Sequence, residues 1–140
     1  MAKVKCELSV IGDGFDPKNL TSILEISPSS FWIKGDLIPG KMRNRLDTCW
    51  NYTTGEMETL SVEDVIDSII GIFSDKIDTM MSFVREQNLQ VKLFLVIRIE
   101  DGLSPSLFLN PKTISFFHAI NAEVDIDLYC NELHTTCTVQ

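Results

Sequence analysis

The chain has 140 residues, of which 44% are hydrophobic and 23% are charged. This composition is typical of a globular protein and excludes a disordered chain, and the length predicts a single domain over residues 1–140. With 20 acidic and 12 basic residues the net charge is −8, which argues against nucleic acid and anionic membranes as partners because both would repel the protein.

The N-terminus and the cysteines indicate the cellular compartment. Residues 1–5 lead directly into an alternating pattern and lack the apolar core and cleavage site of a signal peptide. No stretch approaches the roughly 18 apolar residues of a membrane span. The four cysteines, at positions 6, 49, 130 and 137, form no dense disulfide framework. We therefore expect a cytoplasmic protein with reduced thiols.

The first half of the chain predicts strands and one short helix. Strands are expected over residues 3–11, 31–34 and 45–54, where apolar and polar side chains alternate or β-forming residues cluster. The helix begins at Asp16-Pro17, a capping residue followed by a proline suited to the first turn, and ends before Pro28. Residues 36–44 contain Pro39-Gly40 and predict a loop or hairpin connection.

One long amphipathic helix over residues 62–87 is the clearest element of the pattern. Its apolar residues recur at three- and four-residue steps, so one broad face is expected to be buried, and Asn88 is suited to end the helix. The run Val91–Ile99 then predicts a central strand. One face of that strand is apolar throughout, whereas Phe94 and Val96 predict burial of the other face in its middle only.

The remaining pattern predicts a short strand over 106–109, a helix from Asn110 to about Ile120, and a last strand over 122–129. Residues 131–140 are mostly polar and predict a flexible tail. We therefore expect an α+β fold, in which one long amphipathic helix and two short helices pack on a mostly antiparallel sheet. Two segments with similar strand–turn–helix punctuation suggest a pseudo-duplication around the long helix.

No catalytic or metal-binding motif stands out. Cys130, His134 and Cys137 could supply three ligands, but structural zinc sites favour two paired knuckles, so we expect no metal. His118 has no serine, cysteine or carboxylate motif arranged to work with it. We expect no enzyme activity and no cofactor.

Acidic residues are the candidates for a binding surface. Four of them fall within an arc of about 80° on the predicted long helix, opposite its apolar stripe: Asp64, Asp67, Asp75 and Asp78. Three more share one face of the last strand: Glu123, Asp125 and Asp127. These charges are consistent with ordinary solvated surfaces, with Lys3 and Lys5 balancing the strand acids. The alternative is an electrostatic docking surface for a basic partner.

Several motifs follow one another in a familiar order: Phe15-Asp16-Pro17, Lys34-Gly35-Asp36, Trp50, the long helix, and the final segment from Asn121 to Tyr129. Together they resemble a bacterial family catalogued as domain of unknown function 4279, from about residue 4 to residue 129. The resemblance carries no catalytic residues. Small acidic bacterial proteins of this sort are similar to immunity proteins, which bind a cognate toxin domain and cover its active site or a nearby surface. The resemblance therefore implies a cytoplasmic immunity protein whose toxin partner is expected to be basic, for example a nuclease.

A second hypothesis is a small-ligand-binding or regulatory module. In it Trp32, Trp50 and Tyr52 line an apolar pocket, and Arg43 or Arg45 anchors a polar group. The alternative for these aromatic residues is packing in the core.

Overall fold

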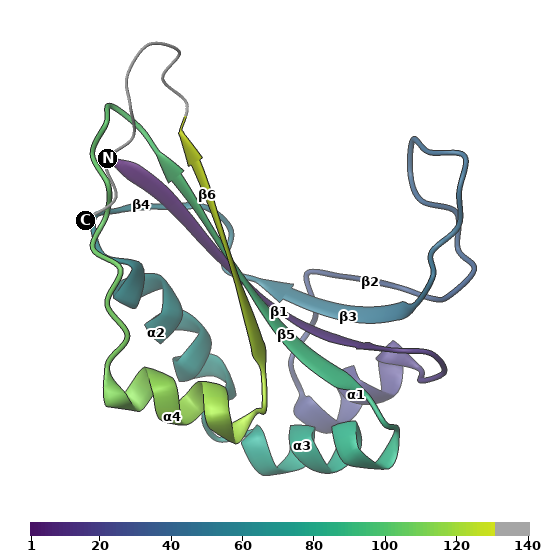
Figure 1. Ribbon diagram of the computed structural model, residues 1–140. Helices are drawn as coiled ribbons and strands as arrows, with labels where there is room; N and C mark the ends of the chain where they lie inside the picture. Colours follow the sequence, from purple (N-terminus) through teal and green to yellow (C-terminus); the bar gives the residue numbers. More distant parts are fainter. Residues whose placement is uncertain (131–140) are drawn as a thin grey trace.

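The computed structural model describes residues 1–130, where a mixed sheet of six strands carries four helices on one face (Figure 1). The strands are β1 (Ala2–Gly12), β2 (Ser30–Trp32), β3 (Thr48–Thr53), β4 (Met57–Thr59), β5 (Gln90–Ile99) and β6 (Glu123–Cys130). The helices are α1 (Pro17–Leu24), α2 (Val62–Phe73), α3 (Ile77–Glu86) and α4 (Pro111–Ala119). The predicted tail, with His134 and Cys137, lies outside the described residues.

The sheet has the strand order β2-β3-β1-β5-β6, and β4 pairs with the N-terminal end of β1. Every strand pair is antiparallel except β5 with β6, which run parallel and are connected through α4. The α+β class and the mostly antiparallel sheet are therefore confirmed. β6 lies at one edge of the sheet and β2 at the other.

The core lies between the sheet and the helices. On β1 the side chains of Val4, Cys6, Leu8 and Val10 are buried on this side, as the alternation over residues 3–11 predicted. Phe73 of α2 packs edge-to-face against Trp50 and Tyr52 of β3, with ring centroids 6.1 and 5.5 Å apart. Burial of aromatic rings contributes strongly to the stability of such a core.

The prediction of one long helix is wrong. The segment forms two helices, α2 and α3, separated by Ser74, Asp75 and Lys76. The Ser74 and Asp75 side chains favour turns over helix interiors, and the N–H of Lys76 donates to the carbonyl of Phe73 at 2.9 Å in a tight turn. The break lets α3 pack against α1 (Figure 1). Apolar spacing continues across it, so periodicity alone cannot detect it.

Three smaller expectations also change. Phe94 and Val96 are only half-buried, because no described helix packs on the far face of β5. Residues 106–109 form no strand, and Ser106 makes only an isolated bridge with Ser61. The short strand β4 was not predicted, since three residues carry too little pattern.

The suggested pseudo-duplication is limited to the order of elements. After α4 the chain enters β6, directly beside β5. After α1 the chain enters β2, but β3 lies between β1 and β2. The two halves therefore differ in how their strands are placed.

Candidate functional site

The face of the sheet opposite the helices is open and forms the floor of a concave surface. No described helix covers it, and its floor holds half-buried side chains together with the buried Ser9, Cys49 and Asn51. Ser9 donates a hydrogen bond to the Asn51 side chain at 2.8 Å, and Lys5 pairs with Glu7 at 3.2 Å. Concave surfaces with a few convergent polar groups are the usual places for a binding site.

At one end of this face, residues 33–47 project from the sheet as an arm (Figure 1). Backbone hydrogen bonds join its two sides: Ile38 donates to Arg43 at 3.0 Å, and Arg45 donates to Asp36 at 2.7 Å. Pro39 and Gly40 form the turn between them, and the φ of 71° at Gly40 requires a residue that tolerates left-handed geometry. The predicted connection over residues 36–44 is thus hairpin-like.

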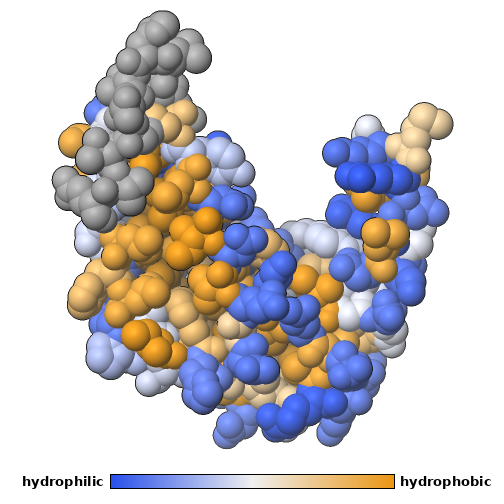
Figure 2. Space-filling view, in the orientation of Figure 1, coloured by the Kyte–Doolittle hydropathy of each residue, from blue (hydrophilic) through white to orange (hydrophobic). Residues whose placement is uncertain are grey.

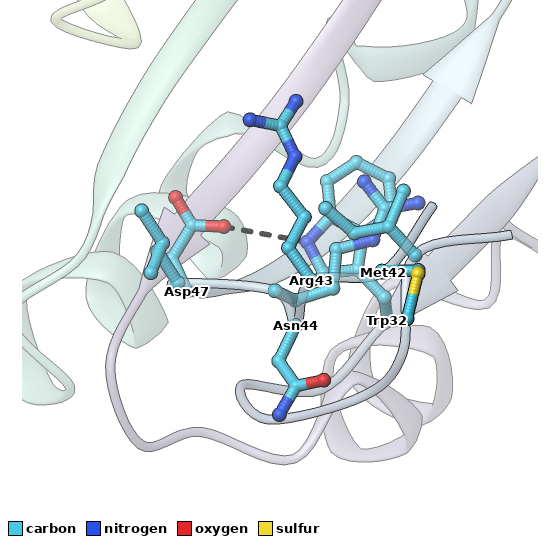
Figure 3. Close-up of a pocket in the computed structure, with 8 residues that line it drawn as sticks. Trp32, Met42, Arg43, Asn44 and Asp47 are labelled. Atoms are coloured by element: carbon cyan, nitrogen blue, oxygen red, sulfur yellow. Dashed lines mark hydrogen bonds between the residues drawn. The ribbon is translucent and has the colours of Figure 1, made fainter. Parts of the chain in front are cut away.

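The base of the arm forms a small cluster around Trp32. The Arg45 guanidinium lies 3.9 Å from the centroid of the Trp32 ring, and the Trp32 indole donates to Asp47 at 3.3 Å. Figure 3 shows this hydrogen bond and the Arg43 side chain extending away from it. The adjoining cavity has a volume of about 560 Å³. A stacked guanidinium beside an indole can hold a planar or anionic group.

Only part of the predicted aromatic pocket is therefore formed. Trp32, Arg43 and Arg45 do line one cavity. Trp50 and Tyr52 point to the other face of the sheet, where the Trp50 indole donates to Thr21 at 3.0 Å. The alternation of β3 places them there, because residues 50 and 52 share the face of buried β1 residues. The sequence pattern did not point to Asp47. The structure adds it to this cluster, because its carboxylate accepts the hydrogen bond of the Trp32 indole.

The two buried cysteines are poorly suited to nucleophilic chemistry. Burial raises the pKa of Cys6 to about 12, with Glu7 adding to the effect. Burial likewise raises the pKa of Cys49 to about 11, partly offset by a hydrogen bond with Ser9. Both thiols are therefore protonated at neutral pH, whereas a cysteine nucleophile needs its thiolate.

At the other end of the open face, β6 places its three acidic residues in one row. Glu123 pairs with Lys92 of β5 at 3.9 Å. The carboxylates of Asp125 and Asp127 form no ion pair with any residue of 1–130. The row therefore keeps two negative charges that no side chain in the described part of the chain neutralises.

The expected partners of these acids bind elsewhere. Lys3 pairs with Glu100 at 3.7 Å, and Lys5 pairs with Glu7. The reason is the strand order, since β5 lies between β1 and β6.

The apolar side of β6 is exposed. Val124 and Ile126 are each 37% exposed and Leu128 is 46% exposed, although they alternate as buried strand residues do. Figure 2 shows hydrophobic side chains gathered over β6, α4 and the segment between β5 and α4. The exposed apolar residues of α4 and that segment include Leu103, Leu107, Phe108, Leu109 and Ile114. Contiguous apolar surface of this kind marks interaction sites in soluble proteins.

The four helical aspartates lie in the helix layer, away from the β6 acids. Asp67 of α2 pairs with Lys112 of α4 at 3.5 Å. Asp64, Asp75 and Asp78 are exposed, and within the described chain they have no ion-pair partner. Because the helices and the β6 acids are on opposite sides of the sheet, the seven predicted residues cannot form one continuous surface. Their role in partner binding stays a prediction.

Within residues 1–130 no group of three histidine, cysteine or acidic side chains is placed to hold a metal ion. None of the described helices is both long and apolar enough to cross a membrane.

Comparison with known families agrees with the order of motifs in the sequence. A family model described as a domain of unknown function, DUF4279, matches residues 2–131. The chain belongs to this family. No curated protein and no solved structure matches it significantly. The match carries no statement about toxins, so the likeness to immunity proteins stays a prediction.

Proposed function

We propose that this chain is a cytoplasmic immunity protein, without enzyme activity of its own, that binds and neutralises a basic toxin domain. The observation that carries the proposal is the edge strand β6. It combines a backbone edge beside which no further described strand lies, two carboxylates without an ion-pair partner in the described chain, and an exposed apolar side. Natural edge strands are usually covered or protected, so one with this surface is suited to a partner.

Electrostatics supports a basic partner. The whole chain carries a charge of −8, and Asp125 and Asp127 add local negative potential at the edge. Complementary potentials raise the rate of association and discriminate against acidic proteins. A nuclease toxin domain, whose surface must attract nucleic acid, has the required positive charge.

The test is co-expression with a candidate toxin domain chosen from the genes that neighbour the gene of this protein. The proposal expects a stable complex on co-purification and restored growth of cells that express both. Absence of both a complex and growth rescue rejects it.

Two matched charge reversals locate the surface. Asp125→Lys with Asp127→Lys is expected to slow association more than about tenfold at low salt, because two attractive contacts become repulsive. Asp64→Lys with Asp78→Lys changes the net charge equally and tests the helical acids predicted from the sequence. If only the helical pair slows association, the docking surface is the helix layer and not β6.

A second candidate function is supported by the cavity at Trp32. Arg43 and Arg45 could anchor an anionic ligand against the indole ring, as in a small-ligand-binding module. The test is a thermal-shift screen with anionic aromatic compounds, repeated with Arg45→Ala. A stabilising compound whose effect disappears in this variant supports ligand binding, and a screen without hits removes it.

A further inference from the structure

Two segments at opposite ends of the open face carry opposite charges that no other residue of 1–130 neutralises. In the arm, Lys41 and Arg43 are exposed and form no ion pair with the residues described here. In β6, Asp125 is exposed and Asp127 is half-buried, and neither forms an ion pair with the described residues. Figure 1 shows that the arm and β6 of one molecule lie too far apart in the fold to meet.

The two segments also share an alternating pattern. In the arm, basic residues at 41, 43 and 45 alternate with Met42, Asn44 and Leu46. Met42 is 103% exposed and Leu46 is 87% exposed, which is unusual for large apolar side chains. In β6 the acids alternate with Val124, Ile126 and Leu128. Residues 41–43 of the arm form bends in the free chain, and once extended along β6 the arm sets bases against acids and apolar side chains against each other.

Pairing of β6 with β6 from a second molecule is opposed by charge. In a two-fold antiparallel pair, residues opposite each other must share a face, so acids lie opposite acids in every symmetric register. Centred on Ile126, for example, Asp125 of each copy faces Asp127 of the other. Like charges directly opposite each other destabilise a strand pair. The edge therefore selects a basic segment, and the arm is one.

We propose that two copies of this chain form a dimer in which the arm of each copy docks on β6 of the other. Because the arm and β6 flank the same open face, a two-fold axis between two such faces creates both contacts at once. The assembly is closed and cannot extend into a fibre. Lys41 and Arg43 then lie against Asp127 and Asp125, and Met42 meets the apolar side of β6.

The dimer goes beyond the proposed function and does not depend on it. It uses the same edge, so a basic toxin domain and a second copy would compete for β6. Binding of the toxin would then convert dimer into a one-to-one complex. The dimer itself can be tested on the protein alone.

The test is the oligomeric state measured by analytical ultracentrifugation over a concentration series at low salt. The wild type is expected to be a dimer. Lys41→Glu with Arg43→Glu, and separately Asp125→Lys with Asp127→Lys, reverse four charges in the two-fold dimer, two in each contact, and should each weaken it about ten-thousand-fold, at roughly tenfold for each reversed charge.

The decisive measurement mixes the two reversed proteins. Each is expected to be monomeric alone, but together they should form a heterodimer, because every reversed arm meets a reversed β6 and every native arm meets a native β6. Matched controls are Lys18→Glu with Arg85→Glu and Asp64→Lys with Asp78→Lys, which change the same charge at exposed helix positions and should leave the dimer intact.

Four outcomes overturn the inference: a monomeric wild type, a dimer that neither reversal weakens, controls that weaken it equally, or reversed proteins that do not combine. A monomer that becomes a dimer when residues 131–140 are removed would show that the chain's own C-terminal residues cover the edge. A monomer that still binds the toxin domain through Asp125 and Asp127 leaves the proposed function standing and rejects only the dimer. Circular dichroism of each variant distinguishes loss of docking from loss of folding.

Discussion

β5 and β6 are parallel neighbours with the same alternation of apolar and polar residues, yet their apolar sides have different environments. On β5, Leu93, Leu95 and Ile97 are at most 2% exposed. On β6, the residues beside them, Val124, Ile126 and Leu128, are 37 to 46% exposed. The helices cover the middle of the sheet and leave its β6 edge open. Alternation therefore shows which side of a strand is apolar, but the position of the strand in the sheet decides whether that side is buried.

The largest expected contrast is between core and edge truncations. Leu95→Ala should lower the free energy of unfolding by about 3 kcal/mol, because it leaves a cavity in the core. Ile126→Ala should cost about half as much, roughly 1.5 kcal/mol, since more than a third of this residue is already in water. Urea denaturation measures both. Equal losses would mean that the apolar side of β6 is covered in solution, as it would be in the dimer at high concentration.

Alkaline pH should lower the free energy of unfolding through Cys6, which is buried on the helix-covered side of the sheet. The pKa of this thiol is about 12 in the folded chain against an ordinary value of 9.0, so its neutral form stabilises the fold below pH 9. As the pH rises from 9 towards 12, ionisation in the unfolded chain removes that stability, by about 2 to 3 kcal/mol at pH 11. The measurement is the unfolding free energy of the wild type minus that of Cys6→Ala, which cancels the titration of lysines and tyrosines. A difference that does not change with pH contradicts the burial of this thiol.

Removal of the N-terminal cap of α4 should destabilise the β6 edge of the sheet and no other strand. The Asn110 side chain accepts a hydrogen bond from the backbone N–H of Thr113 at 2.9 Å, and Asn110→Ala should cost about 1 kcal/mol. Because α4 connects β5 to β6, the loss should speed amide hydrogen exchange in β6 and leave β5 unchanged. The corresponding Asp16→Ala variant, which removes the cap of α1, is the control that should not affect β6.

The smallest effect is expected at the exposed ion pair between the two strands. Glu123 is 63% exposed and 3.9 Å from Lys92, so Glu123→Gln should change the unfolding free energy by no more than about 0.5 kcal/mol. Glu7→Gln, at the less exposed pair with Lys5, should cost more. A larger loss at Glu123 would show that acids on β6 contribute to folding and not mainly to recognition.

Much of the fold could be predicted from local patterns. The alternation of β1 and β5 and the capping residues Asp16 and Asn110 correspond to the observed elements, since each signal lies within a few residues. The break between α2 and α3 could not be predicted in this way. It depends on how α3 packs against α1, and the apolar period continues through Ser74 and Asp75.

The candidate site was only partly predictable for a similar reason. The acidic row on β6 was visible, because residues two apart share a face of a strand. Its lack of neutralising partners was not visible, since it depends on β5 lying between β6 and the lysines of β1. The two tryptophans likewise differ in a way that depends on strand pairing. Trp32 lies beside Arg45 and Asp47, whereas Trp50 lies on the other face of the sheet, in the core.

The parallel pairing of β5 and β6 has a consequence for the order of folding. β1 and β5 can pair and bury their apolar sides before the last strand is in place, whereas β6 must wait for α4 to cross the sheet. Its exposed side chains add little to the folding transition state, so substitutions in β6 are expected to alter the unfolding rate and not the folding rate. The surface proposed here for recognition can therefore vary between relatives without slowing the formation of the core.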